Sequence, residues 1–236
     1  MTTISLDKKA TAFAQFVEKW GAKLATAMGL TLETLDIQES DIVLAVPLDK
    51  GKQSYPIKIF GNPSVIFEEK MDDKDVFLFS ELNAYLVKIN VEGDFAKTWF
   101  AYTDKAEFNG AKDGRTEAAA LEAFWHGKIK ISRGGKLVYE QRLQNLLQIP
   151  DRQLADNVQP TQKNEPVALV RKPVFGGKDK IEIALELGAL SNEARELITG
   201  KIGPDGSEKN DTQNYAIIVL RGFKVTEAAE KYAQLK

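Results

Sequence analysis

Residues 128–140, KIKISRGGKLVYE, decide the fold class that this sequence predicts. Two runs that alternate apolar and polar residues flank the pair Gly134-Gly135. Glycine accepts the positive φ angles that a tight hairpin turn requires. Because side chains alternate across a strand, Lys128 and Lys130 fall on one face and the neighbouring isoleucines on the other. The segment therefore predicts an antiparallel β-hairpin with one basic and one apolar face.

Short strand-like segments continue on both sides of this hairpin. Each is rich in Val, Ile, Leu or aromatic residues, and Gly, Pro, Asp or Asn separates them. The predicted strands are 41–48, 55–60, 65–67, one or two strands within 76–91, 97–102, 167–170, 180–187 and 215–225. Strands at this density indicate a sandwich or barrel and not alternating βαβ units. We expect a mainly β protein built as an antiparallel β-sandwich.

The N-terminal segment has a helical period instead. Large apolar residues recur every three or four positions, which predicts an amphipathic helix over residues 6–28 that ends at Gly29. The stripe comprises Phe13, Phe16, Val17, Trp20, Leu24 and Met28. Either the chain's own domain covers it, or the helix is an arm that docks on a partner. Insertion into a membrane surface fits less well, because the polar face mixes acids and bases. As candidate interface residues we take Phe13, Phe16, Trp20, Leu24 and Met28.

Three further segments predict short helices. Residues 116–125 form the clearest, because Thr116 can cap its start and Gly127 can end it. Residues 191–199 and the tail 226–235 are the others. The polar stretch 150–166 predicts a long loop. We expect an N-terminal helical arm over residues 1–37 and a β-sandwich domain over residues 38–236 that includes this loop.

Composition removes several classes of function. The 236 residues contain no cysteine, which excludes disulfides, thiol nucleophiles and cysteine zinc sites. One histidine, His126, is too few for the usual catalytic triads or multi-histidine metal sites. A formal net charge of −2 provides no global field for attracting nucleic acid. We expect no enzymatic activity, no cofactor and no catalytic metal.

Targeting and membrane segments are also not expected. Residues 1–10 lack the apolar run of a secretory signal. The longest apolar run, 215–220, is far shorter than the ~20 residues needed to cross a bilayer. We therefore expect no membrane span and a protein made in a reducing cytosol.

Other motifs are better explained by local structure than by chemistry. The sequences Gly134-Gly135-Lys136 and Gly176-Gly177-Lys178 do not complete a phosphate-binding loop, and both predict hairpin turns. Two acidic clusters offer oxygen ligands for calcium but lack the calcium-loop order, so solvated turns are the favoured interpretation. These clusters are Asp72, Asp73 and Asp75, and Asp205, Glu208, Asn210 and Asp211. His126 has no evident orienting partner for acid–base work.

The hairpin also carries a local excess of positive charge. Residues 128–142 contain five basic residues and a single acidic residue, Glu140. Tyr139 lies in the same segment and Trp125 shortly before it. The basic residues are Lys128, Lys130, Arg133, Lys136 and Arg142. A basic ribbon with aromatic residues can follow a phosphate backbone and stack bases, so single-stranded nucleic-acid binding is the alternative function. The favoured interpretation is a solvated hairpin edge, where lysines block unwanted strand pairing.

The order of segments resembles β-sandwich structural proteins of bacteriophage virions, coat or auxiliary coat subunits of jelly-roll type. The resemblance rests on FLFSELNAYLVKI (77–89), EAAALEAFW (117–125), GKIKISRGGKLVYE (127–140), LLQIPDRQ (146–153) and NYAIIVLRGF (214–223). It implies a jelly-roll-like sandwich with terminal arms that tie subunits together. Coat subunits with two jelly rolls are usually longer, so we expect one sandwich here.

The resemblance also implies a function. We expect a capsid or capsid-associated subunit, made in the host cytoplasm and located in the virion. Its partners would be copies of itself or other virion proteins. An enzyme that assembles its acid and base from distant residues is the third class of function, but the sequence nominates no such pair.

Overall fold

The computed structural model describes most of the chain. The described residues are 11, 13–65, 68–90, 99–101, 111–112, 115–116, 123–124, 126–146, 167–169, 173–189, 192–202, 207–208 and 212–236. The principal strands are β1 (Ile37–Pro47), β2 (Ser54–Ile57), β3 (Val76–Asn90), β7 (Lys128–Arg133), β8 (Lys136–Arg142), β10 (Val174–Gly176), β11 (Ile181–Glu186) and β12 (Thr212–Val225). The short strands are β4 (Trp99–Ala101), β5 (Ala111–Lys112), β6 (Arg115–Thr116) and β9 (Val167–Ala168). The helices are the π-helix η1 (Val17–Gly21), α2 (Ala22–Met28), the 3-10 helix η2 (Leu143–Asn145), α4 (Asn192–Leu197) and α5 (Ala229–Gln234).

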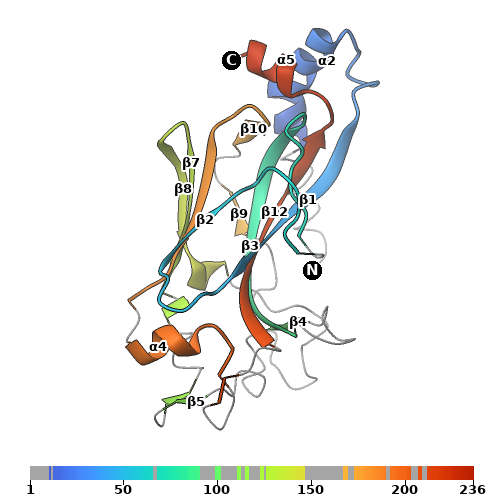
Figure 1. Cartoon of the computed structure of the whole chain (residues 1–236). Coiled ribbons are helices and arrows are strands. Elements are labelled where there is room, and N and C mark those ends of the chain that lie inside the picture. Colours follow the sequence, from blue (N-terminus) through green and yellow to red (C-terminus); the bar gives the residue numbers. More distant parts are fainter. Residues whose placement is uncertain are drawn as a thin grey trace.

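Two antiparallel sheets form a sandwich, and Figure 1 shows them as two layers. One sheet has the order β1-β12-β3-β10, with β4 and β9 also paired to β3. The other has the order β2-β11-β7-β8. The expected antiparallel β-sandwich is confirmed.

The strand order is that of a jelly roll. Along the chain, β1, β2, β3 and β7 alternate between the two sheets, and so do β10, β11 and β12. Of the connections between the eight principal strands, the β7–β8 hairpin is the one that stays within a single sheet. As a result the first and last principal strands, β1 and β12, lie side by side along eleven residue pairs from Ile37↔Val225 to Pro47↔Tyr215. An eight-stranded double sheet with this crossing pattern is the jelly-roll arrangement of two Greek keys.

The main hydrophobic core lies between the sheets because strand alternation sends one side chain in two inward. From β12, Ile218 and Leu220 point into it, and from β7, Ile129 and Ile131 do the same. All four side chains are fully buried. Phe79 and Phe175 meet in this core with ring centroids 6.2 Å apart.

The outer face of the larger sheet is also covered. The alternate residues of β12, Ile217 and Val219, are buried in a second cluster with Val87 of β3. Near the other end of the sheet, the N-terminal helix and α5 cover a third cluster that includes Val76 and Leu78 of β3. A strand that is buried on both faces needs apolar residues at successive positions. This explains the continuous apolar sequence of residues 215–220 in β12.

Helices lie at both ends of the sandwich (Figure 1). Figure 1 shows α2 and α5 at one end, where these two helices contact each other. At the far end lie α4 and β5, which are also in contact, and β4.

The predicted hairpin is confirmed in detail. Its two-residue turn places Gly134 and Gly135 at φ of 56° and 77°, the positive values that the sequence demanded. Strand β3 is one continuous strand, and the predicted helix at 191–199 is found as α4, followed by Gly200.

Three local predictions were wrong. Thr116 does not cap a helix but lies in β6 and pairs with Ala111, although Ala123 and Phe124 are helical. No strand starts at Val65, which lies in a bend, while residues 66–67 of that prediction lie outside the described residues. The turn at Gly176-Gly177 is not a hairpin, because β10 and β11 belong to different sheets. The predicted loop 150–166 lies outside the described residues.

Candidate functional site

The chain itself covers most of the N-terminal apolar stripe. Phe16 and Leu24 are buried, at 1% and 0% exposure, against the outer face of the larger sheet. The Trp20 ring packs at a tilt against the ring of Tyr232 in α5, with ring centroids 4.9 Å apart, and Met28 packs against the same cluster. Phe13 stays 40% exposed while its ring touches that of Phe223. The sequence left two possibilities for this stripe, packing on the chain's own domain or docking on a partner. The structure shows packing on the chain's own domain, so Phe16 and Leu24 are not available to bind a partner.

The basic residues of the hairpin are largely engaged in local contacts. Lys128 Nζ lies 3.2 Å from Glu140 Oε1. Lys130 Nζ lies 2.8 Å from Glu186 Oε1, and this contact raises the pKa of Lys130. Arg133 donates from its guanidinium to the carbonyl oxygen of Val174 at 3.1 Å. The charge available to a polyanion is therefore smaller than the sequence count suggested.

Glu186 is the residue that the sequence analysis missed here. It lies on β11, 46 positions beyond Glu140 in the sequence, and is the cross-strand partner of Lys128. Register between distant strands decides this pairing, so no short motif could have identified it. Lys136 and Arg142 lie at the two ends of β8, and both are exposed.

The first acidic cluster serves the backbone. Asp72 accepts a hydrogen bond from the amide of Lys74 at 2.9 Å. Asp75 accepts one from the amide of Glu227 at 3.1 Å and thereby ties β3 to the turn before α5. Burial raises the pKa of Asp75 despite this bond. Of the second cluster, Glu208 is described, in an isolated bridge with Ile202, and the other three residues lie outside the described part.

Searches for metal and membrane features cover only the described part of the chain. There, no three acidic, histidine or cysteine side chains come close enough together to hold a metal ion. His126 is exposed in a turn. Across the same residues, no helix combines the length and apolar character needed to span a membrane.

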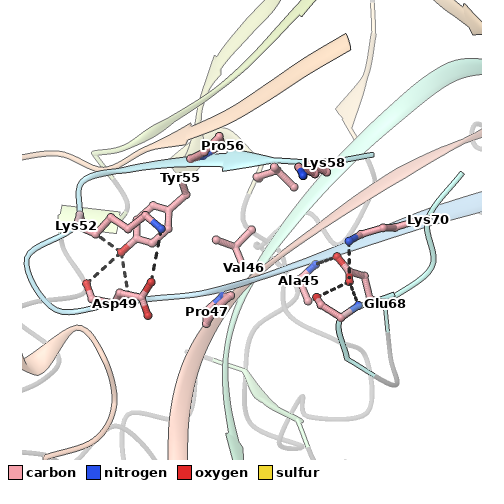
Figure 2. Close-up of a pocket in the computed structure, with 12 residues that line it drawn as sticks. Ala45, Val46, Pro47, Asp49, Lys52, Tyr55, Pro56, Lys58, Glu68 and Lys70 are labelled. Carbon is pink, nitrogen blue, oxygen red and sulfur yellow. Dashed lines mark hydrogen bonds and ion pairs between the residues drawn. The ribbon is translucent and has the colours of Figure 1, made fainter. Parts of the chain in front are cut away.

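A pocket of about 260 Å³ lies at the open edge of the sandwich, where the edge strands β1 and β2 face each other. Figure 2 shows its two walls, with Val46 and Pro47 on β1 and Tyr55 and Pro56 on β2. Because β1 and β2 belong to different sheets, they do not pair, and their side chains line the space between them. The remaining lining residues are Ala45, Asp49, Lys52, Ile57, Lys58, Ser64, Glu68 and Lys70.

A buried carboxylate closes one end of this pocket. Glu68 is 6% exposed, and its Oε2 accepts hydrogen bonds of 2.6 Å from both the amide and the hydroxyl of Ser64. Lys70 Nζ lies 3.2 Å from the same oxygen, and Glu68 Oε1 accepts from the amide of Ala45 at 3.4 Å. Burial alone would raise the pKa of Glu68, but the Ser64 hydrogen bonds and the Lys70 charge outweigh it and hold that pKa below its ordinary value.

Tyr55 organises the opposite end. Its hydroxyl accepts from the amide of Asp49 at 3.1 Å and donates toward the carbonyls of Asp49 and Lys52, at 3.2 and 3.0 Å. Burial raises the pKa of Tyr55 to about 12. Lys52 Nζ sits 4.8 Å from the centre of the Tyr55 ring and 3.6 Å from Asp49 Oδ2. This network fixes the turn between β1 and β2 and keeps Tyr55 from acting as a base near neutral pH.

No short motif in the sequence indicated this pocket. Its residues are spread over positions 45–70 and come together only because a jelly roll places β1 and β2 at the same edge of its two sheets. No family model matches the sequence, and no curated protein matches it. Function therefore has to be inferred from the fold and from these surfaces.

Proposed function

We propose that this chain is a structural protein without catalytic activity, a coat or auxiliary coat subunit of a bacteriophage virion that binds copies of itself or neighbouring virion proteins. The jelly-roll strand order carries the proposal. Viral capsid proteins are among the main users of this architecture, together with lectins and cupins. The resemblance of the segment order to phage coat subunits favours the capsid class.

The packing of the interior supports a structural role over a ligand-binding barrel. Aromatic and aliphatic side chains, among them Phe77, Phe79, Phe124 and Phe175, pack together between the sheets and are fully buried. Barrel-like folds that act on small molecules keep a cavity there. A core packed with large buried side chains favours a rigid subunit whose function depends on its surface and edges.

Exposed apolar side chains mark where that surface can bind protein. Leu137 on the edge strand β8 is 57% exposed, the largest value among the exposed large hydrophobic residues of the described part. The others are Phe13, Leu30 and Leu32. Within the described residues no strand pairs with the outer edge of β8, and an unpaired edge with an exposed leucine is a ready site for contact between subunits.

A concentration series analysed by size-exclusion chromatography with light scattering tests the proposal. We expect the mean mass of the full chain to rise with concentration, and Leu137→Ser to lower the mass at each concentration. Lys136→Ser changes the adjacent exposed residue of β8 and is the matched control, expected to behave as the parent chain. A parent chain that stays monomeric throughout contradicts self-association.

A further inference from the structure

Three lysines and two carboxylates line the pocket between β1 and β2, so one lysine has no carboxylate partner there. Two of its lysines have a carboxylate partner, since Lys70 contacts Glu68 and Lys52 contacts Asp49. Lys58 lies directly after β2, is exposed, and has no counter-ion among the described residues. Figure 2 shows Lys58 at the same end of the pocket as Lys70, away from Asp49.

Neither carboxylate of the pocket is positioned to neutralise Lys58. Both oxygens of Glu68 already accept hydrogen bonds, from Ala45 on one side and from Ser64 and Lys70 on the other. Asp49 lies with Lys52 and Tyr55 at the opposite end. An anion that enters the pocket can therefore pair with Lys58 without displacing an existing contact.

The two walls of the pocket are largely apolar, and the hydroxyls of Ser64 and Tyr55 at its ends already make hydrogen bonds within the chain. Val46 and Pro47 form one wall, and Pro56 and Ile57 form the other. Pro56 carries no amide hydrogen, so at this position β2 cannot pair with an added strand. The volume of about 260 Å³ is below the range typical of sites for drug-sized ligands. A small molecule fits this space better than a polypeptide strand.

We propose that this pocket binds a small organic carboxylate, with the anionic group at the Lys58 ammonium and a short apolar body between Val46, Pro47 and Pro56. Lys70 adds a second positive charge at the same end of the pocket, partly offset by Glu68. The site is independent of the self-association proposed above, because Leu137 does not line it.

Titration with butyrate, followed by the amide resonances of Ala45, Val46, Ile57 and Lys58 in two-dimensional NMR, tests this site. We expect saturable shifts with a dissociation constant on the order of 1 mM, as befits a ligand with few atoms. Acetate lacks most of the apolar body and inorganic phosphate lacks it altogether, so both should bind several-fold more weakly. Lys58→Gln should weaken butyrate binding about tenfold, the usual effect of losing one charge-assisted contact.

Lys178→Gln provides the matched control, because Lys178 is an exposed lysine that does not line the pocket. It should bind butyrate like the parent chain. The proposal is overturned if butyrate gives no saturable shift at these amides, or if Lys58→Gln and Lys178→Gln bind it equally well. It is also overturned if phosphate binds as tightly as butyrate, since the apolar walls would then contribute nothing.

Discussion

Glu68 shows how a buried charge can hold a loop in place. Its carboxylate connects three separate points, the amide of Ala45 in β1, Ser64 in the segment between β2 and β3, and the ammonium of Lys70. Removing one partner of a buried, hydrogen-bonded charge leaves the others unsatisfied. The structure thus assigns Glu68 to stability, although a buried carboxylate in a pocket would otherwise suggest an acid or base.

Replacing Glu68 should produce a pH-dependent loss of stability. The folded-state pKa of Glu68 lies below the ordinary value of 4.5, so its stabilising effect is fully present above that pH and disappears as the pH falls through the folded-state pKa. We expect Glu68→Gln to lower the free energy of unfolding by about 2 kcal/mol at pH 7, with the difference shrinking toward pH 3. Urea denaturation across this range measures it.

The control for this prediction is Glu182→Gln. Glu182 is an exposed residue of β11 whose carboxylate lies 3.6 Å from Lys180 Nζ. Its replacement should change the free energy of unfolding by no more than about 0.5 kcal/mol at any pH. A Glu68→Gln variant that matches this control at pH 7 would contradict the structural role of Glu68.

The N-terminal helix belongs to the folded domain by its contacts. Phe16→Ala should lower the free energy of unfolding by about 3 to 5 kcal/mol, because the ring is buried among residues of β3, β10 and α5. Phe13→Ala, on the same helical stripe, should cost only about 1 kcal/mol because its ring is 40% exposed. Chemical denaturation of the two variants measures the difference. Equal and small losses would show that the helix is an undocked arm.

Strand β12 depends on a close approach between backbones. At Gly222, where the register with β3 shifts, an added Cβ would lie 1.7 Å from the carbonyl oxygen of Leu78. We expect Gly222→Ala to cost about 3 kcal/mol or more in the free energy of unfolding, because backbone cannot move aside as a side chain can. Gly135→Ala, at a turn with open space around it, should cost only about 1 kcal/mol. Thermal unfolding ranks the two variants, and equal losses would contradict the close packing at Gly222.

Sequence predicted those elements whose structure is determined locally. The hairpin around Gly134-Gly135 was predictable because its turn and its alternation lie within one short segment. The strand at Thr116 was not, because its pairing with Ala111 outweighs the residue's preference for capping a helix. The Lys130–Glu186 ion pair was unpredictable, since it depends on the register of β7 with β11.

For the molecule as a whole, the sequence predicted the class of fold but not the strand order. Alternating apolar residues are sufficient to predict a sandwich, whereas the neighbours of each strand depend on contacts between distant segments, such as β1 with β12. The pocket between β1 and β2 could not be predicted for the same reason. It exists only because these two strands are the edges of opposite sheets.

Electron microscopy of the assemblies formed by the concentrated, purified chain tests the central claim most directly. A coat or auxiliary coat subunit should form regularly repeating particles, sheets or rings whose repeating unit has the dimensions of one jelly-roll subunit. Dispersed single particles of monomer mass at every concentration would contradict the claim that this protein works by joining other subunits.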